Sequence, residues 1–338
     1  MMVVIALLLF AYAIKVYQHY QAIHQKKIYQ KLVSLLLSSV QLQRHFDLGL
    51  LQKFKRKIPL LLNVIQELDN LIPADDKTWP LIRQKILYKM MLPRARLLAS
   101  SHNWIKRYTC CQVFQLHYEI KDEPILQKLI DDPIPLISIK AAQLVLKGHS
   151  PKLINTVIDC FAKKRRVQQS FFAEISTGAN TATIPSIIHR LQHEKNPYTK
   201  AFCYHMLNHL PMSTDRVTTI DADLHSDNLD LKLVVLSYCQ HHQYPELNHL
   251  LLNCLDDEKW EVRARAAKLI GLAKQKKLAS YLEKSLTDSV WWVRKNAAQA
   301  LAQLGESGIT ILKRQDPGND QFAYDTASII LSRIEGKL

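Results

Sequence analysis

Histidine and cysteine side chains are the groups in this sequence whose spacing could support metal chemistry. Two histidines four residues apart on a helix lie on the same face and can bind one zinc ion. Polar helix surfaces also produce such pairs without any ligand, so we interpret these as solvated or structural and predict no metal site. The pairs are His189 with His193 and His205 with His209, and Cys239 is close to His241 and His242.

No known catalytic motif accompanies these side chains. The sequence lacks the GxSxG, HExxH, GxGxxG and P-loop patterns, and it has only 8 Gly, which makes a phosphate-cradling loop difficult to build. We therefore predict no catalytic residue and no cofactor. A binding protein is favoured over an enzyme, and the enzymatic alternative stays open.

The six cysteines indicate a reducing environment. None stands in a CxxC pair, and six in 338 residues are too few for a disulfide scaffold. Cys110, Cys111 and Cys203 fall in or beside positions that hold small residues elsewhere in the sequence. A free cysteine behaves there as a small apolar residue, so we expect these three to pack.

The formal charge of +15 is unevenly distributed. Residues 1–120 have a net charge of +11, whereas residues 121–338 have +4. A nearly balanced body argues against nucleic-acid binding, which relies on clustered cations. The local exception is the run Lys163, Lys164, Arg165 and Arg166, interpreted as a solvated helix start that could contact a phosphate or an acidic partner.

The first residues read as a membrane anchor. Met1 to Ile14 contains no charged group, Lys15 can extend its ammonium to the headgroups, and tyrosines follow at Tyr17 and Tyr20. Seventeen largely apolar residues reach the lower limit for a membrane-spanning helix. A cleaved signal peptide would need a preceding basic region and a cleavage site. We predict an uncleaved transmembrane anchor at residues 1–20.

The basic flank after this segment predicts its orientation. Nine basic residues and one acid, Asp47, lie between Lys15 and Lys57. The positive-inside rule then holds the C-terminal body in the cytoplasm, and the flank can attract anionic lipid. Residues 21–99 read as a basic helical linker or cap, helical over 21–72 and again from Trp79, with a break at Pro93.

Residues 100–338 repeat with a period of 31. The clearest copies run from Asp257 to Leu269 and from Asp288 to Ala300. One position of the repeat falls at 107, 138, 169, 200, 232, 263 and 294, where Arg, Ser, Gln, Lys, Lys, Arg and Arg stand. Such a period predicts stacked pairs of helices, the second often opened by proline, with unclear boundaries between 160 and 230.

Each residue type that recurs between the copies has an expected structural role. The small pairs let helices approach closely, the aspartates cap helix N-termini, and the arginines reach the cap acid or the next turn of the neighbouring repeat. The tryptophans, with Trp104, are expected to pack between helices. The repeat positions are Asp257, Trp260, Val262, Arg263, Ala266, Ala267, Asp288, Trp291, Val293, Arg294, Ala297 and Ala298. Trp292 has no counterpart in the other copy, so we expect it to be exposed and a partner contact, together with Lys163, Lys164, Arg165 and Arg166.

The D-x4-V-R-x2-A-A pattern of these copies resembles the HEAT repeat of the phycobilisome-lyase-like type. The resemblance is specific over about 255–305, weaker over 100–255 and absent over 1–100. It implies an α-solenoid with a protein-binding concave surface. The layout is similar to bacterial inner-membrane HEAT-repeat proteins, some of which are linked to envelope or polysaccharide-modifying machinery.

These expectations combine into one prediction. The fold is all-α: an α-solenoid of about seven HEAT-like helical hairpins preceded by one N-terminal transmembrane helix. The function is a scaffold for a protein partner on the cytoplasmic side of the bacterial inner membrane. The alternatives are a HEAT-like lyase-type enzyme, for which no residue set is apparent, and a nucleic-acid-binding HEAT-like protein. A HEAT-like iron hydroxylase would need several His-Glu pairs, and only His193-Glu194 occurs.

Overall fold

The computed structural model describes residues 2–42, 46–148, 150–164, 176–211 and 217–336, without the side chains of 2–14 and 177. Every secondary-structure element in these ranges is a helix, which agrees with the all-α prediction. The chain divides into two compact units, Met1–Leu144 and Val145–Leu338, and each is described by itself.

The first unit begins with a long helix and continues with shorter ones. Its elements are α1 (Met2–Gln41), the 3-10 helix η1 (Leu48–Phe54), α2 (Ile58–Leu71), α3 (Thr78–Ile86), the π-helix η2 (Leu87–Met91), α4 (Leu92–Leu98), α5 (Trp104–Leu116), the 3-10 helix η3 (Ile120–Asp122), α6 (Glu123–Ile130) and most of α7 (Pro135–Lys147).

Helix α1 contacts the unit only through its C-terminal part. From Lys15 to Lys31 it has no buried residue, whereas Leu32, Leu36 and Val40 are buried, and α1 packs on α2. These three are spaced by one helical turn, so they form a single packed face. Within the described residues, none of the helices has the length and apolar character needed to cross a membrane. The anchor prediction rests on residues 1–14, whose side chains lie outside the described part of the chain.

Two local predictions for residues 21–99 are wrong. The expected helix over 21–72 ends at Gln41, and η1 precedes the new helix α2. The expected break at Pro93 is absent, because the chain passes from α3 through the π-helical turn η2 into α4. The Leu92 N–H bonds to the carbonyl of Leu87, five residues back, so Pro93 enters at the first turn of α4, where its missing N–H is tolerated.

The second unit is a series of helical hairpins. Its elements are α8 (Pro151–Ala162), η4 (Ser176–Gly178), η5 (Thr181–Thr183), α10 (Ile184–His193), α11 (Pro197–Leu207), α12 (Ile220–Leu224), α13 (Leu229–His241), α14 (Leu247–Leu255), α15 (Trp260–Leu272), η7 (Lys276–Leu278), α16 (Ala279–Ser285), α17 (Trp291–Gln303), α18 (Glu306–Lys313) and α19 (Gln321–Ile334).

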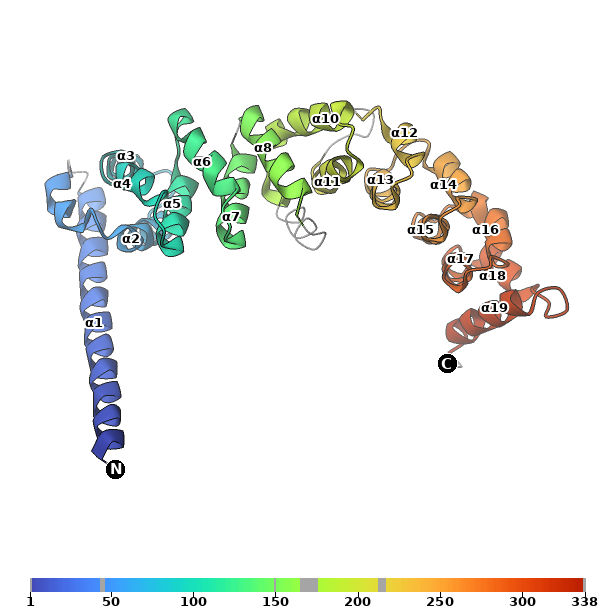
Figure 1. The fold of residues 1–338 in the computed structure, drawn as a ribbon, viewed down its shortest axis with the longest axis horizontal. Helices are drawn as coiled ribbons and strands as arrows, with labels where there is room; N and C mark the ends of the chain where they lie inside the picture. The colour runs from blue at the N-terminus through green and yellow to red at the C-terminus, as the bar shows by residue number, and fades with distance from the viewer. Residues whose placement is uncertain (1, 43–45, 149, 165–175, 212–216, 337–338) are drawn as a thin grey trace. The chain divides into compact units, whose positions relative to one another are not determined.

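The first helices of successive repeats pack directly on one another. Helix α11 contacts α13, α13 contacts α15, α15 contacts α17, and α17 contacts α19. The second helices, such as α14, α16 and α18, form a separate row (Figure 1). Pro151 and Pro185 stand in the first turns of α8 and α10, as proline at a helix start predicts. Helix α12 is short, as its polar surroundings indicate.

Small residues set the closest approach between these helices. Val262, Ala266 and Ala267 of α15 are fully buried, as are the equivalent Val293, Ala297 and Ala298 of α17. Gly308 of α18 lies against α17, where an added Cβ would fall 1.9 Å from the carbonyl oxygen of Leu301. The packing therefore leaves no room at this glycine for even one methyl group.

Gly308→Ala should lower the free energy of unfolding by about 2 kcal/mol or more, although glycine-to-alanine changes usually stabilise a helix. Ser307→Ala is the matched control, because Ser307 is on the exposed face of the same helix and should gain slightly. Urea unfolding of both variants measures the difference. A Gly308→Ala protein as stable as Ser307→Ala would contradict the packing of α17 on α18.

Candidate functional site

A partly buried ion pair joins α15 to the loop that precedes α17. Arg263 Nε and Nη2 donate to the two carboxylate oxygens of Asp288 at 2.7 and 3.0 Å. Its Nη1 donates to the carbonyls of Asp257 and Glu258 in the loop before its own helix. One guanidinium therefore ties its own repeat to the next one, in the bidentate geometry that only arginine provides.

The same arrangement recurs in the first unit. Arg107 Nε and Nη2 donate to Asp132 at 2.6 and 3.0 Å, and Nη1 donates to the carbonyls of Ser101 and His102. In both copies the carboxylate lies 25 residues after the arginine. The repetition of all four kinds of bond shows that the arginine position is a structural joint between repeats.

Lysine makes a simpler form of this joint in the intervening repeats. Lys232 Nζ lies 2.6 Å from Asp257, and Lys200 Nζ lies 2.5 Å from Asp223, which also accepts from the Tyr204 hydroxyl. At the remaining described position, Ser138 Oγ donates to the carbonyl of Ile130. Gln169 lies outside the described residues. We call the joints at Arg107, Lys200, Lys232 and Arg263 the ladder.

The aspartates of the ladder do not cap the helices in the way predicted. Asp257 accepts from the N–H of Lys259, and Asp288 accepts from the N–H of Val290, which are the residues just before α15 and α17. Each carboxylate therefore closes a turn ahead of its helix and offers its outer face to the preceding repeat. The prediction that these two aspartates cap the free N–H groups of the helix is therefore wrong.

Hydrogen bonding controls the protonation of the ladder. Burial alone would raise the pKa of Asp288, but hydrogen bonds from Arg263 and the Val290 N–H outweigh it and hold the pKa below its usual value. The balance is the same for Asp132 with Arg107 and the Ile134 N–H, which lower its pKa. The hydrogen bond to Asp288 raises the pKa of Arg263. Both pairs therefore remain ionised at neutral pH.

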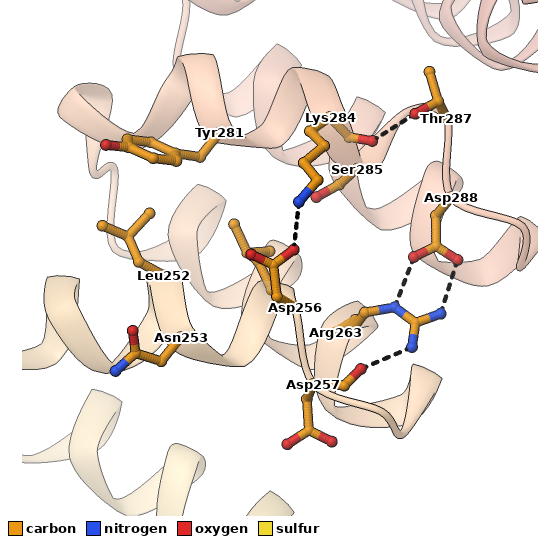
Figure 2. Close-up of a pocket in the computed structure, with 11 residues that line it drawn as sticks. Leu252, Asn253, Asp256, Asp257, Arg263, Tyr281, Lys284, Ser285, Thr287 and Asp288 are labelled. Atoms are coloured by element: carbon orange, nitrogen blue, oxygen red, sulfur yellow. Dashed lines mark hydrogen bonds and ion pairs between the residues drawn. The ribbon is translucent and has the colours of Figure 1, made fainter.

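A groove of about 670 Å³ lies beside the last ladder joint. Residues of α14, α15 and α16 line it, among them Tyr281 and Leu252 (Figure 2). Its charges are internally paired, since Arg263 holds Asp288 and Lys284 lies 2.8 Å from Asp256. The groove thus offers a small ligand no uncompensated charge, and its geometry is that of a junction between repeats.

The tryptophans of the repeat are exposed, which corrects their predicted role in packing. Trp104, Trp260 and Trp291 are each the first residue of a first helix, and they are 44%, 37% and 47% exposed. The buried face of each helix begins later, at positions such as Val262, so the first residue points away from it. Trp292 is exposed, as expected, and packs edge-on against Trp291.

In the second unit, Trp260, Trp291 and Trp292 share the start of a first helix with two further exposed rings. Tyr198 and Phe322 are the second residues of α11 and α19, and both are exposed. We define the aromatic edge as Tyr198, Trp260, Trp291, Trp292 and Phe322. Exposed aromatic side chains in a repeated position are typical of an interaction surface.

The first two residues of the lysine and arginine run, Lys163 and Lys164, follow the C-terminal end of α8. Lys163 is the C-cap of α8, and the Lys164 ammonium lies 4.1 Å from the centre of the Phe161 ring. Cations are favoured at this end because the helix dipole is negative there. Arg165 and Arg166 lie outside the described residues.

The cysteines of the small-residue positions are buried. Cys110, Cys111 and Cys203 have no exposed surface, and burial raises the pKa of Cys111 and of Cys203 to about 12. A protonated buried thiol is a poor nucleophile and a poor metal ligand. These positions act as small apolar residues.

The histidines gather without forming a metal site. The rings of His189 and His193 stack at 4.3 Å, and His209, His241 and His242 line one shallow hollow. Among the residues that the structure describes, no three His, Cys, Asp or Glu side chains are positioned to hold a metal ion.

Three features of the site were not identified from the sequence. Asp223 was missed because it lies 23 residues after Lys200, two short of the usual offset. Phe322 and Asn319 were missed as repeat positions, although 31 residues separate them from Trp291 and Asp288. That spacing was a usable signal for both.

Comparison with known proteins identifies the repeat. Residues 248–321, which run from α14 into the start of α19, match the HEAT-repeat family. The search of curated proteins gave no match. Among solved structures, the X-ray structure of the Escherichia coli protein YibA aligns with 79% of this chain and 98% of its own, at 17% identity and a TM-score of 0.39. That TM-score is too low to define a shared arrangement.

Asp288→Asn should lower the free energy of unfolding by about 2 kcal/mol at pH 7, because it leaves the Arg263 charge without its carboxylate. The folded pKa of Asp288 is depressed, so this contribution is full above the unfolded value of about 4 and is lost as the pH falls through the folded pKa. Urea unfolding of wild type and variant between pH 7 and 3 should therefore show two curves that converge in acid.

Asp256→Asn is the matched control, because Asp256 and Lys284 are both at least 70% exposed at the side chain. An exposed pair contributes little, so this variant should change stability by less than about 0.5 kcal/mol. Equal losses in the two variants would mean that the ladder joint is no stronger than a surface pair.

Proposed function

We propose that this HEAT-repeat protein is a membrane-anchored scaffold that binds a protein partner along its aromatic edge. The observation that carries the proposal is that charged and aromatic residues of the repeat have different roles. The charged positions Lys200, Lys232 and Arg263 form joints between repeats, while aromatic residues at the starts of α11, α15, α17 and α19 stay exposed and α13 begins without one. HEAT repeats generally mediate protein binding, and these exposed rings give a partner apolar contacts.

The chemistry of the edge favours binding over catalysis. Its rings lie next to cations, as in Lys295, whose ammonium is 4.9 Å from the rings of both Trp291 and Trp292. Five of the six cysteines are buried, and burial raises the pKa of Cys111, Cys203 and Cys239 to about 12, so these thiols are poor nucleophiles. The lyase-type enzyme and the nucleic-acid-binding protein remain the alternatives, since both can be built from HEAT-like repeats.

The anchor is the second part of the proposal. We infer that residues 1–20 insert into the bacterial inner membrane, with the body in the cytoplasm. Support comes from the uncharged run up to Ile14 and from the nine basic residues that follow it. Helix α1 is continuous from Met2 to Gln41, so an inserted segment would be rigidly joined to the body.

The exposed part of α1 would set the distance between the membrane surface and the packed helices of the first unit. Residues 21–28, between the inserted segment and Tyr29, whose hydroxyl donates to Glu67 of α2, would form a stalk of about 12 Å at 1.5 Å per residue. Lys53, Lys55 and Lys57 lie beyond the packed end of α1, so they would stay away from the lipid surface. Lys15, near the end of the inserted segment, and Lys26, on the stalk, are the better candidates for contact with anionic headgroups.

The full chain should remain in the membrane pellet after carbonate washing. The double variant Leu7→Arg and Leu9→Arg should be released, because two arginines in the span oppose insertion. Ile23→Arg, on the exposed stalk, is the control and should stay in the pellet. Release of the wild-type chain would end the anchor proposal.

A photoreactive phenylalanine analogue at Trp292 should crosslink a protein partner in intact cells. The same analogue at Tyr281, which is exposed on the second-helix row, is the control and should not. Absence of any crosslink from Trp292, or turnover of a substrate by the purified chain, would contradict a scaffold that acts through the aromatic edge.

A further inference from the structure

Arg294 is the last arginine of the 31-residue series, and it is oriented like the earlier ones. Its Nη1 donates to the carbonyls of Asp288 and Ser289 at 2.8 and 3.1 Å. Arg107 and Arg263 make the same two bonds to the loops before their own helices. The loop contacts therefore hold the Arg294 guanidinium in the position that a ladder joint requires.

The acidic half of the joint is missing at Arg294. Arg107 and Arg263 each bind an aspartate 25 residues later in the chain, Asp132 and Asp288. The residue 25 positions after Arg294 is Asn319, which has no carboxylate. Arg294 is only 9% exposed, and its Nε is buried and has no hydrogen-bond partner among the described residues. A buried charged donor without an acceptor is costly, so the free guanidinium favours any carboxylate that can reach it.

The two acids of the segment between α18 and α19 accept hydrogen bonds from backbone N–H groups. Asp316 accepts from the N–H of Gly318, and Asp320 accepts from the N–H of Ala323 at the start of α19. No ion pair with Arg294 occurs among the described residues. The sequence of this terminal loop thus leaves the joint open within the chain.

The surroundings of Arg294 suit a peptide more than a small anion. Phe322 covers the guanidinium face with its ring centre 5.1 Å away, and the ring is still 66% exposed. Because Phe322 stacks on the face and Nη1 is bonded to the loop, a bidentate carboxylate would pair with the Nε and Nη2 side of the guanidinium. Trp291, Trp292 and Lys295 stand close by in sequence at the start of α17, so apolar and positive groups frame the same place.

We propose that Arg294 is a docking site for an aspartate or glutamate side chain of a protein partner, whose neighbouring apolar residues pack on Phe322 and the α17 tryptophans. The partner would complete at the end of the series the joint that Asp288 makes with Arg263. This inference rests on the proposed scaffold function and adds to it the chemistry of the partner: an acidic residue in an extended loop with apolar neighbours.

The test uses a peptide that copies the chain's own joint. The probe is Lys-Ser-Leu-Thr-Asp-Ser-Val, the sequence of residues 284–290, with an asparagine version of the same peptide as its control. Binding to the full chain in detergent is measured by calorimetry and by tryptophan fluorescence. We expect the aspartate peptide to bind at least about tenfold more tightly than the asparagine peptide, the change that one charge-assisted hydrogen bond corresponds to.

Two variants of the chain show whether Arg294 is responsible. Arg294→Lys keeps the charge but loses the planar fork and offers a single contact, as Lys232 does to Asp257, so the preference for aspartate should fall severalfold without vanishing. Asn319→Asp supplies a carboxylate from within the chain at the ladder offset, so it should raise Tm and weaken peptide binding. Equal binding of the two peptides, or unchanged preference in both variants, would overturn the proposal.

Self-association is a separate outcome of the same experiment. If sedimentation shows a dimer that Asn319→Asp disrupts, the occupant is a second copy of this chain and a different partner is ruled out for this site. Failure here is distinguishable from failure of the scaffold proposal. A Trp292 crosslink that persists in Arg294→Lys would leave the scaffold standing without the carboxylate site, whereas no crosslink in wild type would remove the scaffold itself.

Discussion

The joint between one repeat and the next is the constraint on which this structure depends. A single helical hairpin is too small to bury its apolar face alone, so each repeat is stable only against its neighbours. Small residues such as Ala267 and Ala298 provide close contact, but flat helix surfaces can slide. The bidentate bond from Arg263 to Asp288 is directional, and it sets one register between α15 and α17.

A joint of this kind contributes more to specificity than to net stability. Removing two charges from water is expensive, and the attraction between them offsets that cost only when the geometry and the remaining hydrogen bonds are satisfied. Arg263 meets this condition because all three of its nitrogens are bonded. The third bond, to the loop before its own helix, explains why the guanidinium is already positioned before the neighbouring carboxylate arrives. Arg294 retains the positioning bonds without the carboxylate, which makes the end of the series chemically different from its middle.

The repeated elements could be predicted from the sequence because they obey a fixed spacing. A period of 31 placed the first helices and the small-residue positions, and it placed the Arg263 side chain toward the next repeat. The predictions that proved wrong concern positions whose structure depends on local backbone geometry. Trp260 is exposed because it is the first residue of its helix, and Pro93 does not break its helix because a π turn absorbs the missing N–H. Asp223 lies within the short helix α12 itself, a position that no fixed spacing could locate.

The most direct test of this account is a double-mutant cycle on Arg263 and Asp288, using Arg263→Met, Asp288→Asn and the two together, with unfolding by urea at pH 7. If the joint couples adjacent repeats, the sum of the two single-variant losses in unfolding free energy should exceed the loss in the double variant. We expect a coupling free energy of about 1–3 kcal/mol. Additive losses, with coupling below about 0.5 kcal/mol, would show that the repeats are held by apolar packing alone and would contradict the central role given to the ladder.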